Sequence, residues 1–179
     1  LLDLAWRDLA IARDDRPVVD TGLVEARVQL KLAVSSSLSV RSASVSVDGG
    51  LVGQIEQGLL IYLGVADQDG EQEVRWLAEK IANLRIFDAS ATAKTSRSVA
   101  DIGGAALVIS QFTLLADVRK GRRPSFSGAA VPAHAKQVYE AFLLQLGQLI
   151  PVQAGVFGGD MQVKSVNDGP FTLVVEPPA

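Results

Sequence analysis

Residues 43–55, ASVSVDGGLVGQI, constrain the fold more tightly than any other stretch of the chain. Apolar and polar residues alternate through Val45 and Val47 and resume at Leu51, and Asp48 and Gly49 between them are typical of a two-residue β-turn. The stretch therefore predicts a β-hairpin. The next segment, GLLIYLGV, is apolar on both faces and predicts a central strand.

Two helical patterns separate the other predicted strands. Residues 70–87 carry apolar side chains on one face and charged ones on the other, and PAHAKQVYEAFLLQLGQLI begins with Pro132, which suits a first helical turn. AALVISQF is a second buried strand, and MQVKSV and FTLVV are strands joined by NDGP. This order predicts an α+β fold, a compact single domain with a mixed or antiparallel sheet and two main helices.

The N-terminal residues leave two alternatives for the first strand. LLDLAWRDLAIARDD is too charged for a signal peptide, so we expect residues 1–25 to be an extension and residues 26–179 to form the domain. Either ARVQLKLAV is the strand that leads into the hairpin, followed by a serine-rich loop, or AVSSSLSV takes its place. Strand alternation favours ARVQLKLAV.

Composition excludes several kinds of function. The 179 residues include no cysteine and one histidine, so the chain cannot form a disulfide, a thiol nucleophile or a zinc-binding histidine cluster. Phosphate-loop, dinucleotide-binding, nucleophile-elbow and HExxH motifs are absent, and no window reaches the roughly 20 apolar residues of a membrane span. We expect a cytoplasmic protein without metal, cofactor or membrane contact. Because the formal charge is −3, a polyanion would have to meet a local basic patch.

Three segments carry candidate chemistry. In SQFTL, Gln111 and Thr113 alternate with Phe112 at a strand end, where free backbone N–H groups suit an oxyanion, although a strand cap also explains these residues. RKGRRPSF places four cations within five residues, which suits phosphates and also an ordinary solvated loop. NDGPFT is a tight connection between two strands, which an ordinary turn explains.

Together these segments resemble one family, the D-aminoacyl-tRNA deacylases, also called D-tyrosyl-tRNA deacylases. The similarity covers residues 43–172 in order and spacing, through ASVSVDGGLVGQIEQGLLIYLGV, LAEKIANLRIF, ALVISQFTLLADVRKGRRPSF, VYEAF and FGGDMQVKSVNDGPFT. The family's two signature motifs are SQFTL and NxGPxT. A sister family that removes L-alanine carries a PQATL-like motif, so the serine and phenylalanine of SQFTL favour the D-specific branch.

The resemblance implies a homodimer that hydrolyses the ester between a D-amino acid and the terminal adenosine of tRNA. Glycyl-tRNA is a second expected substrate, and L-aminoacyl-tRNA is excluded. The expected catalytic residues are Ser110, Gln111, Phe112 and Thr113. The expected selector of chirality, which enters the partner's pocket, consists of Asn167, Gly169, Pro170 and Thr172. The expected tRNA contacts are Arg119, Lys120, Arg122 and Arg123.

In the implied mechanism, a cis Gly169–Pro170 dipeptide would accept hydrogen bonds from the α-ammonium of the substrate. Backbone N–H groups near Gln111 and Phe112 would face the ester oxygen. Because no side chain is an obvious base, a ribose hydroxyl of the tRNA would assist, and Thr113 would be positional rather than nucleophilic.

Two other functional classes stay open at this point. A noncatalytic RNA-binding module would use the basic loop alone, and a protein-only esterase would cleave small aminoacyl esters without tRNA. The chain also departs from the family, since the glutamine and arginine usual in its first strand are not recognisable.

Overall fold

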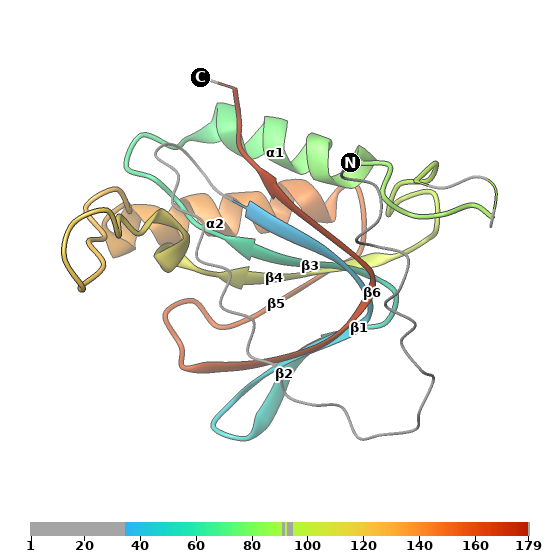
Figure 1. Cartoon of the computed structure of the whole chain (residues 1–179), viewed down its shortest axis with the longest axis horizontal. Helices are drawn as coiled ribbons and strands as arrows, with labels where there is room; N and C mark the ends of the chain where they lie inside the picture. The colour runs from blue at the N-terminus through green and yellow to red at the C-terminus, as the bar shows by residue number, and fades with distance from the viewer. Residues whose placement is uncertain (1–34, 91, 93–94, 179) are drawn as a thin grey trace, which may run out of the picture.

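In the computed structural model, residues 35–90, 92 and 95–178 are described, with residues 35–38 and Pro170 described for the backbone only. The helices are α1 (Glu71–Asn83) and α2 (Pro132–Gly147), with a short 3₁₀ turn η1 (Phe112–Leu115). The strands are β1 (Ser35–Val47), β2 (Gly50–Ile55), β3 (Gly58–Leu63), β4 (Ala105–Ser110), β5 (Val152–Ala154) and β6 (Met161–Val175). Both helices cover one face of the sheet (Figure 1).

The sheet is mixed, which confirms the predicted α+β class. Its order is β2-β1-β3-β4-β5. Strand β6 pairs with the edge of β1 that lies opposite to both β2 and β3. The pairs that β1 forms are antiparallel, whereas β3, β4 and β5 run parallel. The parallel strands are joined through α1 and α2, the long connections that such pairs require. The three-residue strand β5 was not predicted, because it is too short to show a period.

The predicted hairpin is confirmed. Strands β1 and β2 pair up to Val47 and Gly50, and the residues between them, Asp48 and Gly49, have φ angles of 50° and 77°. Positive φ at both turn positions is the geometry that matches the twist of two strands joined by two residues. Glycine adopts it without steric cost.

The favoured prediction for the first strand is wrong. The strand that leads into the hairpin begins at Ser35 and includes SSSLSVRS, which was expected to be a loop, while ARVQLKLAV lies entirely outside the described residues. Residues 35–40 pair with β3 on one side, and all of them except Ser39 pair with β6 on the other. Hydrogen bonding along both edges of the backbone outweighs the weak strand preference of serine, so sheet context decides this segment.

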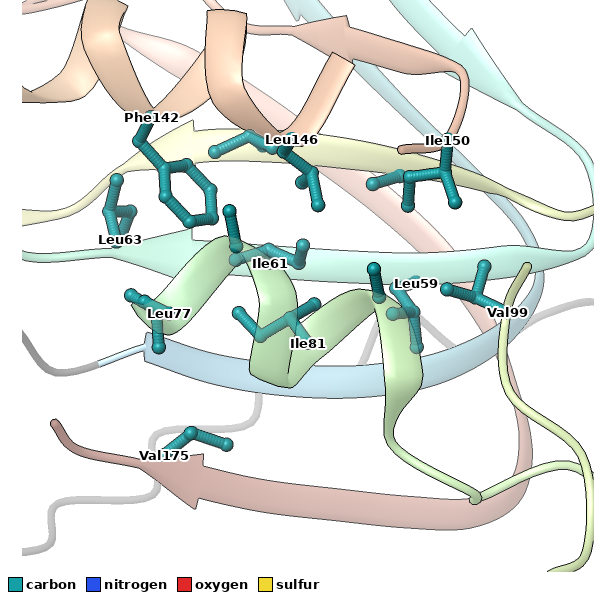
Figure 2. Packing of buried hydrophobic residues seen from close by; sticks show 14 of the residues in the cluster. Leu59, Ile61, Leu63, Leu77, Ile81, Val99, Phe142, Leu146, Ile150 and Val175 are labelled. Carbon is teal, nitrogen blue, oxygen red and sulfur yellow. The ribbon is translucent and has the colours of Figure 1, made fainter. Parts of the chain in front are cut away.

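The main core lies between the sheet and the two helices, as Figure 2 shows. The predicted helix over residues 70–87 ends earlier, at Asn83, and its buried residues are Val74, Leu77, Ala78, Ile81 and Ala82. From the central strand, Leu59, Ile61 and Leu63 enter this core, while Leu60 faces a smaller cluster on the opposite side of the sheet. Strand β3 is therefore buried on both faces, as its sequence predicted.

Strand β6 replaces the two strands predicted around NDGP. It runs from Met161 to Val175 beside β1, and the NDGP residues form an irregularity within it. Neither helix among the described residues is long and apolar enough to cross a bilayer.

Candidate active site

The first candidate segment lies where β4 ends. Ser110 is the last residue of β4, and Phe112 to Leu115 form the 3₁₀ turn η1. The alternation expected for SQFTL is therefore wrong beyond Ser110, because the chain leaves the sheet there. Gln111 and Thr113 still lie together, since Gln111 Nε2 donates a hydrogen bond to Thr113 Oγ1.

Backbone donors at this turn differ from those expected. The N–H of Gln111 donates to Leu63 O at 2.8 Å, so it is engaged in the sheet and is not a free oxyanion donor. The N–H groups of Phe112 and Thr113 have no partner among the described residues. This follows from their place in the first turn of a helix, whose N–H groups lack intrahelical acceptors. The available donors are thus shifted one residue along the chain.

Among the described residues, no acid–base side chain contacts Thr113. Its hydroxyl is hydrogen-bonded only to Gln111 within the part of the chain that the structure describes. His134 lies in the first turn of α2, where Nε2 is 2.9 Å from Asp69 O. Without a carboxylate or imidazole contact, the Thr113 hydroxyl has nothing to raise its nucleophilicity.

The basic segment forms a loop closed at its base. Asp117 and Ser125 exchange two backbone hydrogen bonds of 2.7 and 2.9 Å, so the cations lie on the loop between them. Arg119 donates to both carboxylate oxygens of Asp117, from Nε at 2.8 Å and from Nη2 at 2.6 Å. These bonds hold the pKa of the Asp117 carboxyl well below its usual range and raise the pKa of Arg119.

The pairing of Arg119 divides the four cations into two groups. Arg119 is engaged with Asp117 and shapes the loop. Lys120, Arg122 and Arg123 are exposed and have no ionic partner in the described ranges. These three are therefore the cations free to contact a phosphate. The ion pair between Asp117 and Arg119 was not predicted from the sequence, although an acid two residues before an arginine in a loop is a readable signal.

An aromatic contact joins η1 to this loop. The Phe112 ring is 56% exposed and meets Phe126 edge to face, with ring centroids 5.0 Å apart and planes at 69°. Phe126 directly follows the bridge that closes the basic loop. The end of β4, an exposed aromatic ring and three free cations thus lie on one side of the fold.

The second signature motif lies in a bulge of β6. Asn167 pairs with Val40 and Thr172 pairs with Leu38, so residues 168–171 stand opposite a single residue, Ser39. Gly169 has a φ of 118°, which only glycine adopts readily. No cis peptide bond occurs among the described residues, so the cis Gly169–Pro170 bond implied by the family resemblance is not observed.

Within one chain the two motifs lie far apart. Strand register aligns Ser110 with Leu63, Ser35 and Val175, whereas Asn167 is aligned with Val40, Gly58 and Ala105 at the other end of β4. The offset is about 17 Å along the strands and about 14 Å across them, from ordinary strand spacings. In Figure 1 the arrowhead of β4 and the bend of β6 lie on opposite sides of the view.

Comparison with known proteins identifies the family. Residues 38–176 match the family model described as D-Tyr-tRNA(Tyr) deacylase. The chain belongs to the D-Tyr-tRNA(Tyr) deacylase family. Members of this family are hydrolases that cleave the ester bond of D-aminoacyl-tRNA, so aminoacyl-tRNA is the substrate class of this deacylase.

Two solved structures are similar to this deacylase over most of its length. One, the "c-Myc DNA Unwinding Element Binding Protein", is 36% identical, with a TM-score of 0.77 over 82% of this chain and 99% of that one. Another, titled as a probable eukaryotic D-amino acid tRNA deacylase, is 15% identical, with a TM-score of 0.71 over 81% and 99%. The second supports the fold alone. The described residues of the deacylase hold no group of three side chains placed to bind a metal ion.

Proposed function

We propose that this deacylase proofreads chirality in translation as a homodimer, in which each pocket combines the β4 end of one chain with the β6 bulge of its partner. The separation of SQFTL and NxGPxT within one chain supports this arrangement most directly. An aminoacyl group is only a few ångströms across, so one chain cannot surround it with both motifs. A second copy can supply the missing half, and two-fold symmetry then completes two equivalent pockets.

In the proposed pocket, the reaction depends on backbone donors and on the substrate itself. The free N–H groups of Phe112 and Thr113 would stabilise the oxyanion that forms when water attacks the ester carbonyl. A ribose hydroxyl of the terminal adenosine would assist the proton transfer that no described side chain is placed to perform. Thr113 and Gln111, joined by their hydrogen bond, would keep η1 in position beside Ser110.

Contact with tRNA would come from the basic loop and the adjoining aromatic ring. Lys120, Arg122 and Arg123 suit the phosphates near the 3′ end, because no side chain in the described part of the chain neutralises their charges. Arg119 would shape the loop through Asp117 and contact phosphate less directly. Exposed Phe112 suits stacking with an unpaired base, which is the usual partner of such rings in RNA recognition.

Discrimination between D- and L-aminoacyl groups would rest on Gly169 and Pro170 of the partner, flanked by Asn167 and Thr172. A rigid backbone can accept hydrogen bonds from the α-ammonium and leave no room for an L side chain. Glycine has no side chain to exclude, so glycine attached to the wrong tRNA should also be removed. We place this activity in the cytoplasm, where translation supplies the substrate, and assign it to residues 26–179.

Hydrolysis of matched substrates tests the proposal. D-Tyr-tRNA should be cleaved much faster than L-Tyr-tRNA, Gly-tRNA should be cleaved, and D-tyrosine methyl ester should be nearly inert. Equal rates for D- and L-Tyr-tRNA would contradict chiral proofreading. Rapid cleavage of the methyl ester would favour a protein-only esterase, and tight tRNA binding without cleavage would favour a noncatalytic RNA-binding module.

A further inference from the structure

The β6 bulge is held by two residues of β1 that belong to neither signature motif. Ser39 Oγ donates a hydrogen bond of 2.7 Å to the main-chain oxygen of Asp168. Arg41 Nε lies 3.2 Å from Asp168 Oδ1 and forms an ion pair with it. Asp168 occupies the variable position of NxGPxT, directly before Gly169.

These contacts occur where the β1–β6 ladder is irregular. Its register shifts between Leu38 and Val40, and again between Val40 and Ser42. Ser39 thus faces the four bulged residues, and Arg41 is an additional residue of β1 without a paired position on β6. A bulge interrupts the regular hydrogen bonds of a strand ladder, so side-chain contacts hold the backbone in place there.

We propose that Ser39 and Arg41 are positioning residues that set the orientation of the Gly169–Pro170 selector through Asp168, and so set discrimination between D- and L-aminoacyl groups. The inference rests on the proposed function. Its physical basis is the planarity of the peptide unit, because the Asp168 carbonyl lies in the same plane as the N–H of Gly169. Fixing this carbonyl therefore fixes the direction in which the chain enters Gly169.

The two tethers differ in strength. Ser39 is 2% exposed, so loss of its hydroxyl removes a hydrogen bond to Asp168 that is shielded from water. The ion pair is accessible to solvent, with side chains 73% and 40% exposed, so salt and water weaken it. Ser39 should accordingly matter more than Arg41, and the contribution of Arg41 should decrease at high salt.

The test uses two kinds of variant with matched controls. Ser39→Ala removes the hydroxyl, Ser39→Thr keeps it, and Arg41→Gln removes both the charge and the Nε–H donor of the exposed pair. Ser98→Ala is the control for a buried serine, since Ser98 is 5% exposed and its Oγ accepts from the Asp101 N–H. Arg75→Gln is the control for an exposed ion pair, that of Arg75 with Glu71.

Two readouts are measured on each full-length variant. Hydrogen exchange over residues 165–173 reports whether the bulge is tethered, without reference to activity. Single-turnover rates on D-Tyr-tRNA and L-Tyr-tRNA give the discrimination ratio. For Ser39→Ala we expect faster exchange and a ratio lowered roughly tenfold, the size of one hydrogen bond to a buried group. Arg41→Gln should lower the ratio roughly threefold at low salt. Ser39→Thr, which keeps the hydroxyl, should retain the wild-type ratio.

Unchanged exchange and an unchanged ratio in both Ser39→Ala and Arg41→Gln would overturn the inference. It would also be overturned if Ser98→Ala lowered the ratio equally, since general destabilisation would then be the cause. Should Ser39→Ala fail to fold, the exposed Arg41→Gln variant decides alone. A wild-type protein that does not prefer D-Tyr-tRNA would contradict the proposed function, while exchange would still report on the tether.

Discussion

At the scale of single residues, replacing Thr113 distinguishes assistance by a tRNA hydroxyl from nucleophilic attack by the protein. If the tRNA supplies the assisting hydroxyl, Thr113→Ala should lower the deacylation rate by less than the 10²- to 10³-fold that an oxyanion donor typically contributes, because backbone donors survive truncation of the side chain. D-aminoacyl-tRNA lacking the terminal 2′-hydroxyl should bind normally and react far more slowly. Single-turnover rates with matched binding measurements check both. An acyl-enzyme trapped on Thr113 would instead assign the nucleophile to the protein.

Asp117 provides a prediction about pH. Its pKa is lowered, chiefly by the side-chain and backbone hydrogen bonds from Arg119, so the pair stabilises the loop above the ordinary carboxyl pKa of about 4. This stabilisation should be lost as pH falls from about 4 through the lowered pKa. An NMR titration should show the depressed pKa in the wild type and its return toward about 4 in Arg119→Gln. Arg75→Gln is the control and should leave the Asp117 titration unchanged.

At the scale of elements, the loop between Asp117 and Ser125 should bind the phosphates of tRNA electrostatically. Replacing Arg122 and Arg123 with glutamine should weaken tRNA binding and lower the slope of log K against log salt by about 0.7 to 0.9 for each phosphate that the loop no longer neutralises. The control replaces Lys80 and Arg85, which lie at and just beyond the C-terminal end of α1. Equal slopes for the two double variants would mean that the loop does not bind phosphate.

Helix α1 should stabilise the fold through its buried face. Leu77 is 1% exposed within the core of Figure 2, so Leu77→Ala should lower the free energy of unfolding by about 2 to 5 kcal/mol. Leu144 on α2 is 73% exposed, and Leu144→Ala should change the free energy of unfolding by less than about 0.5 kcal/mol. Denaturant unfolding measures both. Similar losses of stability for the two variants would contradict the assigned packing.

At the scale of the whole molecule, the proposed dimer can be tested by complementation. Phe112→Pro removes a backbone donor of η1, and Gly169→Val disables the selector, so each variant alone should be inactive. A mixed dimer should regain one complete pocket, because the intact η1 of one chain meets the intact bulge of the other. Activity on D-Tyr-tRNA is measured after unfolding and refolding the two together. A mixture as inactive as its components would exclude a pocket shared in this way, and sedimentation of a fully active monomer would exclude the dimer itself.

Local patterns of the sequence determined several parts of this molecule. The hairpin at Asp48 and Gly49, the central strand β3 and the buried face of α1 were predicted correctly, because turn chemistry and side-chain period act over a few residues. The family could also be inferred from SQFTL and NxGPxT, whose residue types and spacing are specific. The cluster of cations was visible in the same way.

Tertiary structure decided the rest through contacts between distant segments. The serine-rich residues that follow Ser35 became a strand because β3 and β6 pair with both of their edges. Pairing with Leu63 engaged the Gln111 N–H, and Asp117 engaged Arg119, so the free donors and cations are fewer than the sequence suggested. Strand register also separated the two motifs within one chain. Register depends on partners more than a hundred residues apart, and no local period of the sequence carries that information.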